Sequence, residues 1–282
     1  MTRILKKIKS IVAITLLIPA IGFATQSEKK ADDVLRIGYQ KYGTLILLKA
    51  SGELEKRLAP LGVKVTWNEF PAGPQLLEGL NVGSIDFGTV GETPPIFAQA
   101  ANAKITYIGY KPASPKSEAI IVQKDSSIKS VADLKGKKVV LNKGSNVHYL
   151  LVKALENAGL KYSDIETVFL APADARAAFE RGSVDAWVIW DPFLAAAETS
   201  IGAKVLKDGT NTVNNHQFYL AEESYSSKRA DIVAIIFEEL KKVNDWAISK
   251  PKEVANALAP LTGLDVVTLE KALSRGGYGI NY

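Results

Sequence analysis

The chain has 282 residues, of which 47% are hydrophobic and 23% are charged. This composition is typical of a globular protein with one large domain or two smaller ones, and it excludes a disordered or fibrous chain. The chain contains no cysteine. The sequence therefore excludes disulfides, thiolate metal sites, a cysteine nucleophile and a lipid-modified cysteine anchor.

The first 24 residues have the layout of a secretory signal peptide. A cluster of four basic residues precedes an apolar run over 11–23, and the segment ends in small residues. The apolar run is too short for a membrane-spanning helix and contains Pro19. We expect cleavage near Ala24 and a soluble product in the periplasm.

The charge balance changes when this segment is removed. Residues 1–24 carry four of the 35 basic residues and none of the 30 acidic ones, which leaves 31 basic residues against 30 acidic ones. The mature chain has no long basic run and no stripe of basic and aromatic residues. The sequence therefore argues against nucleic-acid binding.

Two series of alternating strands and helices follow. The first has expected strands over 35–40, 63–70, 85–90 and 105–110, with helices over 45–58, 73–82 and 94–101. The second begins after the polar stretch 111–118, with expected strands over 118–123, 137–142, 166–170 and 185–190 and helices over 145–159 and 173–182. This spacing predicts parallel βαβ units. The last third is predicted to be mostly helical, with a long helix over 231–248 and shorter helices after Pro251 and Asp265.

The two series repeat the same arrangement of residues. GSIDFGTVGETPP at 83–95 and GSVDAWVIWDPF at 182–193 each place a strand before a polar stop and a proline. A second pair of strand ends, at 40–44 and 142–145, also passes into helices. These correspondences predict an α/β protein with two duplicated parallel-sheet lobes. The lobes would join near 111–118 and again near 211–219, with a ligand cleft between them.

The ends of parallel strands are the usual place for a ligand. Helix starts there offer free backbone N–H groups and the positive end of the helix dipole, so several of them facing one cleft would bind an anion. Small polar residues occupy these starts: Thr44, Thr93, Ser145 and Asp191. The alternative is that each of these side chains only caps its own helix.

Several longer stretches carry a family resemblance. GETPPIFAQA, ADLKGKKVVLNKGS and APADARAAFERGSVDAWVIWDP closely resemble the aliphatic sulfonate-binding proteins that deliver substrate to ABC importers. The resemblance extends from about Leu35 to Tyr278. It implies a two-lobed, type II-like periplasmic binding-protein fold, closure on an alkanesulfonate, and docking on a membrane permease with its ATPase. It implies no catalytic residue and no cofactor, and we expect a monomer.

The resemblance also implies a set of ligand contacts. The first group comprises Gln40, Gly91, Glu92, Thr93, Ser145 and Asn146, and further candidates are Tyr42, His148, Asp174, Trp190 and Asp191. Trp190 would either cover the alkyl part of the ligand or pack in the core of its lobe. His148 is more typical of a packed helix residue. Glu92 would cap its helix, pair with a basic residue such as Lys41, or bind a polar substituent of the ligand, and the sequence leaves these three open.

The expected lobes follow from the same resemblance. Lobe 1 would comprise residues 33–112 and the return segment 217–282, and lobe 2 residues 113–216. The family usually continues with helical sequence beyond the position of Tyr282. We expect either a truncated return segment or a gene that lacks these helices.

Rival functions have less support in the sequence. Thiamine-pyrimidine synthases share the architecture but carry a cysteine-rich motif, which this chain lacks. No catalytic motif is visible, and two histidines cannot form a metal site by themselves. The nearer alternative is a binding protein for taurine, nitrate or a related oxyanion.

Overall fold

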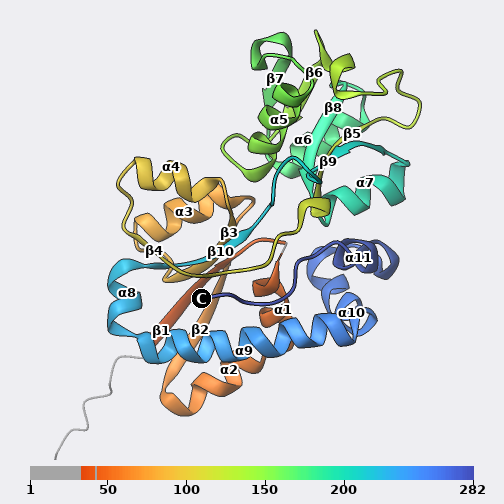
Figure 1. Cartoon of the computed structure of the whole chain (residues 1–282). Helices are drawn as coiled ribbons and strands as arrows, with labels where there is room; N and C mark the ends of the chain where they lie inside the picture. Colours follow the sequence, from red (N-terminus) through yellow and green to blue (C-terminus); the bar gives the residue numbers. More distant parts are fainter. Residues whose placement is uncertain (1–32, 42) are drawn as a thin grey trace, which may run out of the picture. The chain divides into compact units, whose positions relative to one another are not determined.

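Two five-stranded sheets form the framework of the chain in its computed structural model, which describes residues 33–41 and 43–282. The strand order is β2-β1-β3-β10-β4 in the first sheet and β7-β6-β8-β5-β9 in the second (Figure 1). The first sheet consists of β1 (Asp33–Tyr39), β2 (Val63–Glu69), β3 (Phe87–Gly91), β4 (Ile105–Tyr110) and β10 (Gln217–Glu222). The second consists of β5 (Glu118–Val122), β6 (Lys138–Leu141), β7 (Glu166–Phe169), β8 (Ala186–Trp190) and β9 (Lys204–Asp208). The predicted α/β fold with two sheets is confirmed.

Each sheet contains one strand that runs against its neighbours. β10 is antiparallel to β3 and β4, and β5 is antiparallel to β8 and β9. Each sheet is therefore mixed, where the sequence predicted parallel strands alone. The reason is that β5 and β10 follow segments that cross between the sheets, so both strands begin at the edge where the parallel strands end. β9 and β10 are also strands that the sequence analysis did not predict.

Helices pack around both sheets. The first sheet is accompanied by α1 (Thr44–Ser51), α2 (Glu53–Leu58), α3 (Gly73–Asn81), α4 (Pro94–Ala100), α8 (Glu223–Lys228), α9 (Ala230–Ser249), α10 (Pro251–Thr262) and α11 (Val266–Leu273). The second is accompanied by α5 (Asn146–Asn157), α6 (Pro172–Glu180) and α7 (Phe193–Ile201). The single helix predicted over 45–58 is two helices, because Gly52 at φ 64° ends α1 in the left-handed conformation.

Each sheet has its own hydrophobic core. The core of the first sheet includes Phe87, Tyr219 and Phe237, whose ring centroids lie 5.4–6.2 Å apart. The core of the second includes Phe179 and Trp187, with ring centroids 5.8 Å apart. Burial of each such side chain stabilises its lobe by about 1.5–3 kcal/mol.

Two crossing segments, residues 111–117 and 209–216, connect the sheets and bind each other. Ser114 N donates to Asn214 O at 3.0 Å, and Gly209 N donates to Pro115 O at 2.9 Å. At the first sheet, Lys111 N donates to Gln217 O at 2.8 Å. Paired in this way, the two segments form the connection about which the lobes would move relative to each other.

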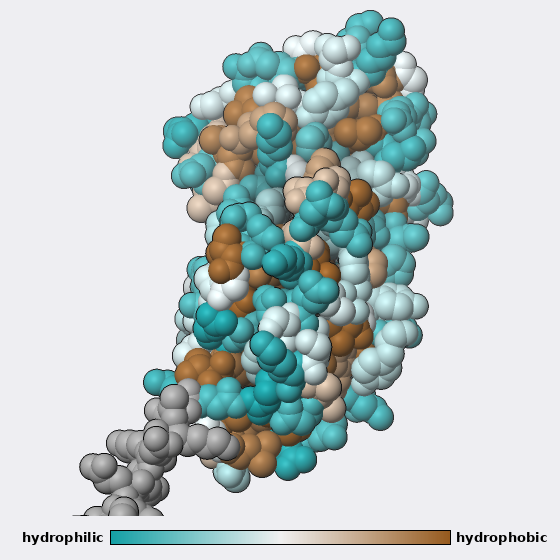
Figure 2. Space-filling view, turned by 90° about the vertical axis from the view of Figure 1, so that its left-hand side faces the viewer, coloured by the Kyte–Doolittle hydropathy of each residue, from teal (hydrophilic) through white to brown (hydrophobic). Residues whose placement is uncertain are grey.

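One face of the molecule is mainly hydrophilic (Figure 2). Figure 2 shows hydrophilic side chains over most of one face, with hydrophobic ones in small separate patches. Within the described part of the chain, no helix combines the length and the apolar character needed to cross a membrane.

Candidate functional site

Strand ends from both sheets meet around a small space that we call the central cavity. Its volume is about 30 Å³, enough for about two water molecules. Its lining residues are Gln40, Gly73, Gly91, Pro94, Glu118, Ser145, Asn146, Trp190, Asn215 and Gln217. The structure therefore brings together five of the expected ligand contacts: Gln40, Gly91, Ser145, Asn146 and Trp190.

Asn146 connects the two lobes directly. From the start of α5, its Oδ1 accepts a hydrogen bond from Thr93 N at 3.1 Å, and its Nδ2 donates to Asn215 Oδ1 at 2.6 Å. Gly91 makes this approach possible, because a Cβ there would lie only 2.1–2.2 Å from the Asn146 amide atoms. The first lobe thus presents a backbone N–H group to an oxygen atom from the second.

The hydroxyl groups of Thr93 and Ser145 do not cap their helices. They occupy the N-cap positions of α4 and α5, yet neither side chain accepts a hydrogen bond from its helix. Ser145 Oγ donates to Asn142 O at 2.7 Å. Thr93 Oγ1 is buried and has no partner among the described residues. The capping alternative therefore fails at both positions, and it also fails for Thr44, whose hydroxyl lies 2.5 Å from the hydroxyl of Tyr219.

Glu92 binds the second crossing segment. Its carboxylate accepts hydrogen bonds from Asn215 N at 3.1 Å and His216 N at 2.9 Å. It does not cap α4, and Lys41 lies 3.7 Å from Glu69 instead. Both oxygens of Glu92 are used in this way, so the residue positions the crossing segment beside β3. Glu92 and Thr93 also line a groove of about 730 Å³, together with Tyr149 of α5 and residues 210–214 of the second crossing segment.

Gln40 and Trp190 contribute to the central cavity from the ends of two strands. Gln40 is buried and its Nε2 donates to Thr89 O at 3.2 Å, so the side chain is fixed against β3. Trp190 belongs to the hydrophobic core of its lobe and also lines the central cavity. The core-packing interpretation of Trp190 is therefore confirmed, and its contact with the alkyl part of a ligand stays a prediction.

Glu118 also lines the central cavity, and the sequence analysis missed it. It starts β5 directly opposite Trp190 and is 1% exposed. Neither carboxyl oxygen has a partner among the described residues, and burial, assisted by the charge of Glu92, raises its pKa well above the ordinary value. Burial thus favours the protonated carboxyl, which can donate one hydrogen bond. A glutamate after a polar stretch gives no sign of burial in the sequence.

Asn215 and Gln217 were missed as well. Asn215 is 2% exposed and has φ 53°, a left-handed conformation that asparagine tolerates. Its Nδ2 donates to Ser114 O and to Ser117 Oγ, both at 3.0 Å, so it also joins the two crossing segments. The consecutive asparagines at 214–215 were the available signal, since such pairs mark turns.

Two expected contacts, His148 and Asp174, line none of the described cavities. His148 Nε2 lies 2.9 Å from the Tyr162 hydroxyl, and its Nδ1 accepts from Gly144 N at 3.2 Å. Burial, with a smaller effect of Lys143, lowers the pKa of His148 and favours the neutral ring. Asp174 is exposed in the first turn of α6 and lines none of the cavities described here. Tyr42 lies outside the described residues, as does the expected signal peptide.

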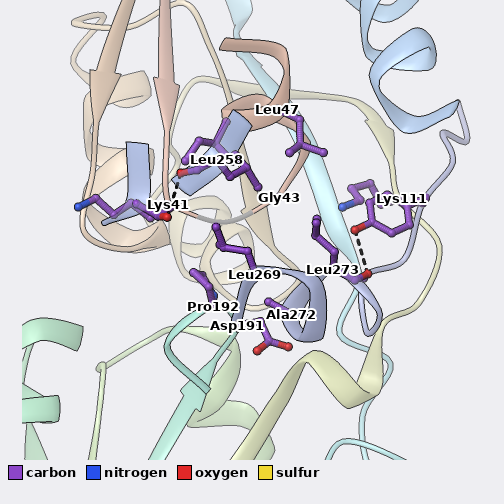
Figure 3. A pocket seen from close by; sticks show the side chains of 14 residues that line it. Lys41, Gly43, Leu47, Lys111, Asp191, Pro192, Leu258, Leu269, Ala272 and Leu273 are labelled. Carbon is purple, nitrogen blue, oxygen red and sulfur yellow. Dashed lines mark hydrogen bonds between the residues drawn. The ribbon is translucent and has the colours of Figure 1, made fainter. Parts of the chain in front are cut away.

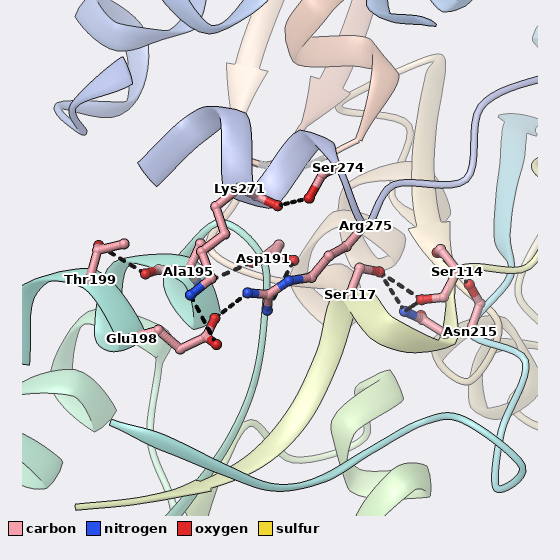
Figure 4. Close-up of polar contacts among 10 residues, drawn as sticks. All are labelled: Ser114, Ser117, Asp191, Ala195, Glu198, Thr199, Asn215, Lys271, Ser274 and Arg275. Atoms are coloured by element: carbon pink, nitrogen blue, oxygen red, sulfur yellow. Dashed lines mark hydrogen bonds and ion pairs between the residues drawn. The ribbon is translucent and has the colours of Figure 1, made fainter. Parts of the chain in front are cut away.

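Asp191 belongs to a charged contact between the lobes (Figure 4). Its Oδ1 accepts from Ala195 N at 3.0 Å, so the carboxylate does bind the start of α7. Its Oδ2 lies 3.8 Å from the guanidinium of Arg275, which also pairs with Glu198. Lys271 lies 3.1 Å from the same Glu198. Although Arg275 opposes the effect, burial raises the pKa of Asp191 to about 7.

A second cavity, which we call the lateral cavity, lies between α1, α10, α11 and the end of β8 (Figure 3). Its volume is about 50 Å³. Its lining is mainly apolar and includes Ile46, Leu47, Leu258, Leu269, Leu273 and Pro192. Its charged lining residues are Lys41, Lys111 and Asp191.

The chemistry of the central cavity suits an anion with several acceptor atoms. It offers the buried carboxyl of Glu118, which has no partner among the described residues, and the uncapped start of α5 supplies backbone N–H groups. Among residues 33–41 and 43–282, no group of three or more histidine, aspartate or glutamate residues could hold a metal ion.

Comparisons with known proteins agree on one family. Residues 59–254 match the family described as NMT1/THI5 like. An aliphatic sulfonates-binding protein of Escherichia coli (strain K12) is 47% identical over 89% of this chain and 78% of its own length. The solved alkanesulfonate-binding protein SsuA from Xanthomonas axonopodis pv. citri, bound to MOPS, is 40% identical with a TM-score of 0.83, covering 88% of this chain and 86% of that one. The periplasmic aliphatic sulphonate binding protein SsuA from Escherichia coli is 46% identical with a TM-score of 0.79, covering 88% and 81%. The chain therefore belongs to the NMT1/THI5-like family.

Proposed function

We propose that this chain is the substrate-binding protein of an ABC importer and that it captures aliphatic sulfonates. The observation that carries the proposal is the central cavity, where both lobes of a sulfonate-binding fold present buried polar groups to one small space. A sulfonate has three acceptor oxygens and no donor at neutral pH, so it matches hydroxyl, carboxyl and backbone N–H donors. The function is binding and release, without turnover of the ligand.

Thr93 follows Gly91 of the central cavity by two residues and lines the groove of about 730 Å³, and we propose that its side chain also contacts the ligand. Its hydroxyl is buried without a partner, whereas its backbone N–H already donates to Asn146 across the cleft. A buried hydroxyl without a hydrogen bond costs roughly 1–3 kcal/mol, which a ligand oxygen would recover. The cavity of about 30 Å³ is smaller than a sulfonate with its alkyl chain. The lobes therefore have to separate for entry, and the Asn146 contact has to yield.

We propose export to the periplasm with cleavage near Ala24, and delivery of the ligand to a membrane permease with its ATPase by a monomer. Lobe 1 would comprise residues 33–112 and 217–282, and lobe 2 residues 113–216. Mass spectrometry of the exported protein tests the cleavage, with a new N-terminus expected close to Thr25.

Calorimetry with a panel of anions tests the function. The panel contains pentane-1-sulfonate, taurine, sulfate and nitrate, each titrated into the purified protein. We expect one pentane-1-sulfonate bound per chain and recovered unchanged. Tight binding of nitrate or taurine with none of the alkanesulfonate would replace the proposal by the corresponding oxyanion or aminosulfonate importer. Release of sulfite would indicate an enzyme.

The variant Thr93→Val tests the site itself. Valine keeps the shape and removes only the hydroxyl, so affinity should fall by roughly 1.5–3 kcal/mol, the value of a hydrogen bond to a charged group. The melting temperature should stay unchanged or rise, because no protein hydrogen bond is lost. Thr106→Val in β4, where the side chain lines none of the described cavities, is the matched control. Equal affinity of both variants would place the sulfonate elsewhere.

A further inference from the structure

Lys111 is a buried cation for which the described residues supply no counter-ion. Its side chain lines the lateral cavity and is 4% exposed. The ammonium lies 5.6 Å from the centre of the Tyr278 ring, and no carboxylate of the described residues pairs with it. Burial lowers its pKa to about 8, so most molecules still carry the charge at pH 7. A buried ammonium is stable only with a compensating anion or polar group, and the ring supplies a small part of this.

The backbone of Lys111 is held in place, so its position is built into the fold. Lys111 N donates to Gln217 O at 2.8 Å, and its carbonyl oxygen lies 2.9 Å from His216 Nδ1. Figure 3 shows the ammonium turned toward the interior of the lateral cavity, while Asp191 lies at another part of its wall. Asp191 faces the guanidinium of Arg275 at 3.8 Å. The lateral cavity therefore contains one ammonium group, that of Lys111, for which the described residues supply no anionic partner.

The lateral cavity adjoins the central cavity. At the end of β1, Gln40 lines the central cavity and Lys41 the lateral one. At the end of β8, Trp190 lines the central cavity and Asp191 lines the lateral one. Consecutive Cα atoms lie about 3.8 Å apart, so the two cavities share a wall at both strand ends. At about 50 Å³ the lateral cavity has room for a carboxylate-sized group.

We infer that the lateral cavity is a subsite for a second anionic group on the ligand, so that the preferred substrates are short sulfocarboxylates. The sulfonate would occupy the central cavity, the carbon chain would cross beside Gly43, and the distal carboxylate would pair with Lys111. Leu47 and Leu273 would exclude water from this pair, which strengthens it. The inference rests on the proposed function, because it assumes that the sulfonate binds centrally.

Calorimetry with two ligands of equal chain length tests the inference. We compare 3-sulfopropanoate with propane-1-sulfonate on the wild-type protein and on Lys111→Met. Methionine has a similar length and no charge, so it fills the same apolar space. The wild type should bind 3-sulfopropanoate about tenfold or more tightly than propane-1-sulfonate, the ratio expected for a charge-assisted hydrogen bond. Lys111→Met should lose this preference and keep the affinity for propane-1-sulfonate within about twofold, since that ligand does not reach the ammonium.

The exposed Lys116 provides the matched control, and Lys116→Met should keep the preference of the wild type. Equal binding of the two ligands by the wild type would overturn the inference and leave the sulfonate function intact. Equal weakening of both ligands by Lys111→Met, with melting unchanged, would also overturn it. Failure of the wild type to bind either ligand would overturn the proposed function together with the inference.

Discussion

The two sides of the interlobe cleft are held together by different chemistry. At the central cavity, Asn146 makes neutral hydrogen bonds with Thr93 N and Asn215. Beside α11, Arg275 and Lys271 form ion pairs with Glu198. A ligand oxygen can replace the Asn146 oxygen as the acceptor for the Thr93 N–H group. Separation of ion pairs with low solvent exposure costs more free energy. We therefore expect that the neutral side exchanges its hydrogen bonds when a ligand binds and that the charged side keeps the lobes associated.

The largest effect is expected for Glu198→Ala on the charged side. The variant removes the carboxylate that pairs with Lys271 and Arg275 and leaves Arg275 with Asp191 at 3.8 Å, and the Arg275 and Glu198 side chains are only 14% and 16% exposed. Loss of one partner of a buried pair costs about 3–5 kcal/mol, which the remaining exposure reduces to about 2–4 kcal/mol. Denaturant unfolding measures the loss of stability, and small-angle scattering should show a more open protein.

The matched control for Glu198→Ala is Glu156→Ala. Glu156 pairs with Lys153 on the surface of α5 at 2.6 Å, and its side chain is 55% exposed. An exposed pair of this kind contributes at most about 0.5 kcal/mol. If both variants lost the same stability, the charged side would not hold the lobes.

The neutral side was the easier one to predict from the sequence. Glycine and hydroxyl residues at strand ends, such as Gly91 and Ser145, mark helix starts, and family motifs added Asn146. The charged side was not predicted, because Glu198 and Arg275 lie 77 residues apart and each alone is typical of a surface position. Glu118 and Lys111 were missed for the same reason. Their burial depends on the packing of the crossing segments, which local pattern does not encode.

The fold shows a similar division. Local periodicity predicted most of the strands and helices that build each lobe, including α9, α10 and α11 but not α8. It did not predict β9 and β10, because their pairing with β5 and with β3 and β4 is a long-range contact. The places of β5 and β10 in their sheets depend on where the chain crosses between the lobes. The spacing of strands and helices along the sequence therefore could not predict the mixed sheets.

The second prediction concerns pH and Asp191, also on the charged side. Burial raises the folded-state pKa from 3.8 to about 7, so between these values the folded protein binds more protons than the unfolded chain. The free energy of unfolding should therefore fall as pH rises from 5 to 7, by about 2–3 kcal/mol from this group. Asp191→Asn keeps the acceptor for Ala195 N and should give a flatter profile. A wild-type profile that rises over this range, unaltered in the variant, would contradict the prediction.

The third prediction tests the neutral side through Gly91→Ala. The new methyl group would lie 2.1–2.2 Å from the Asn146 amide, so this side chain has to rotate away and give up its hydrogen bonds to Thr93 of lobe 1 and to Asn215 of the second crossing segment. Each bond contributes about 1 kcal/mol, so the closed state should lose about 2 kcal/mol. Scattering should show a weaker compaction on addition of ligand.

Asn146→Ala provides the control for that steric argument. In the double variant the alanine at 91 meets no amide, so the two changes should be far from additive. Additive losses would mean that Gly91 acts through backbone conformation and not through Asn146.

The smallest effect is expected for Thr199→Val. Thr199 Oγ1 in α7 lies 2.7 Å from Thr268 Oγ1 in α11, a neutral hydrogen bond beside the charged pairs. The same hydroxyl contacts Ala195 O at 2.9 Å, while Thr268 Oγ1 keeps Asp265 Oδ2 at 2.8 Å as a partner. Because Thr268 is not left without a partner, the variant should lose only about 0.5–1.5 kcal/mol. Ser200→Ala, one residue along α7 and without a bond to α11, is the control in the same denaturation experiment. If Thr199→Val lost as much stability as Glu198→Ala, neutral hydrogen bonds and not charge would hold this side of the cleft, and the contrast between the two sides would fail.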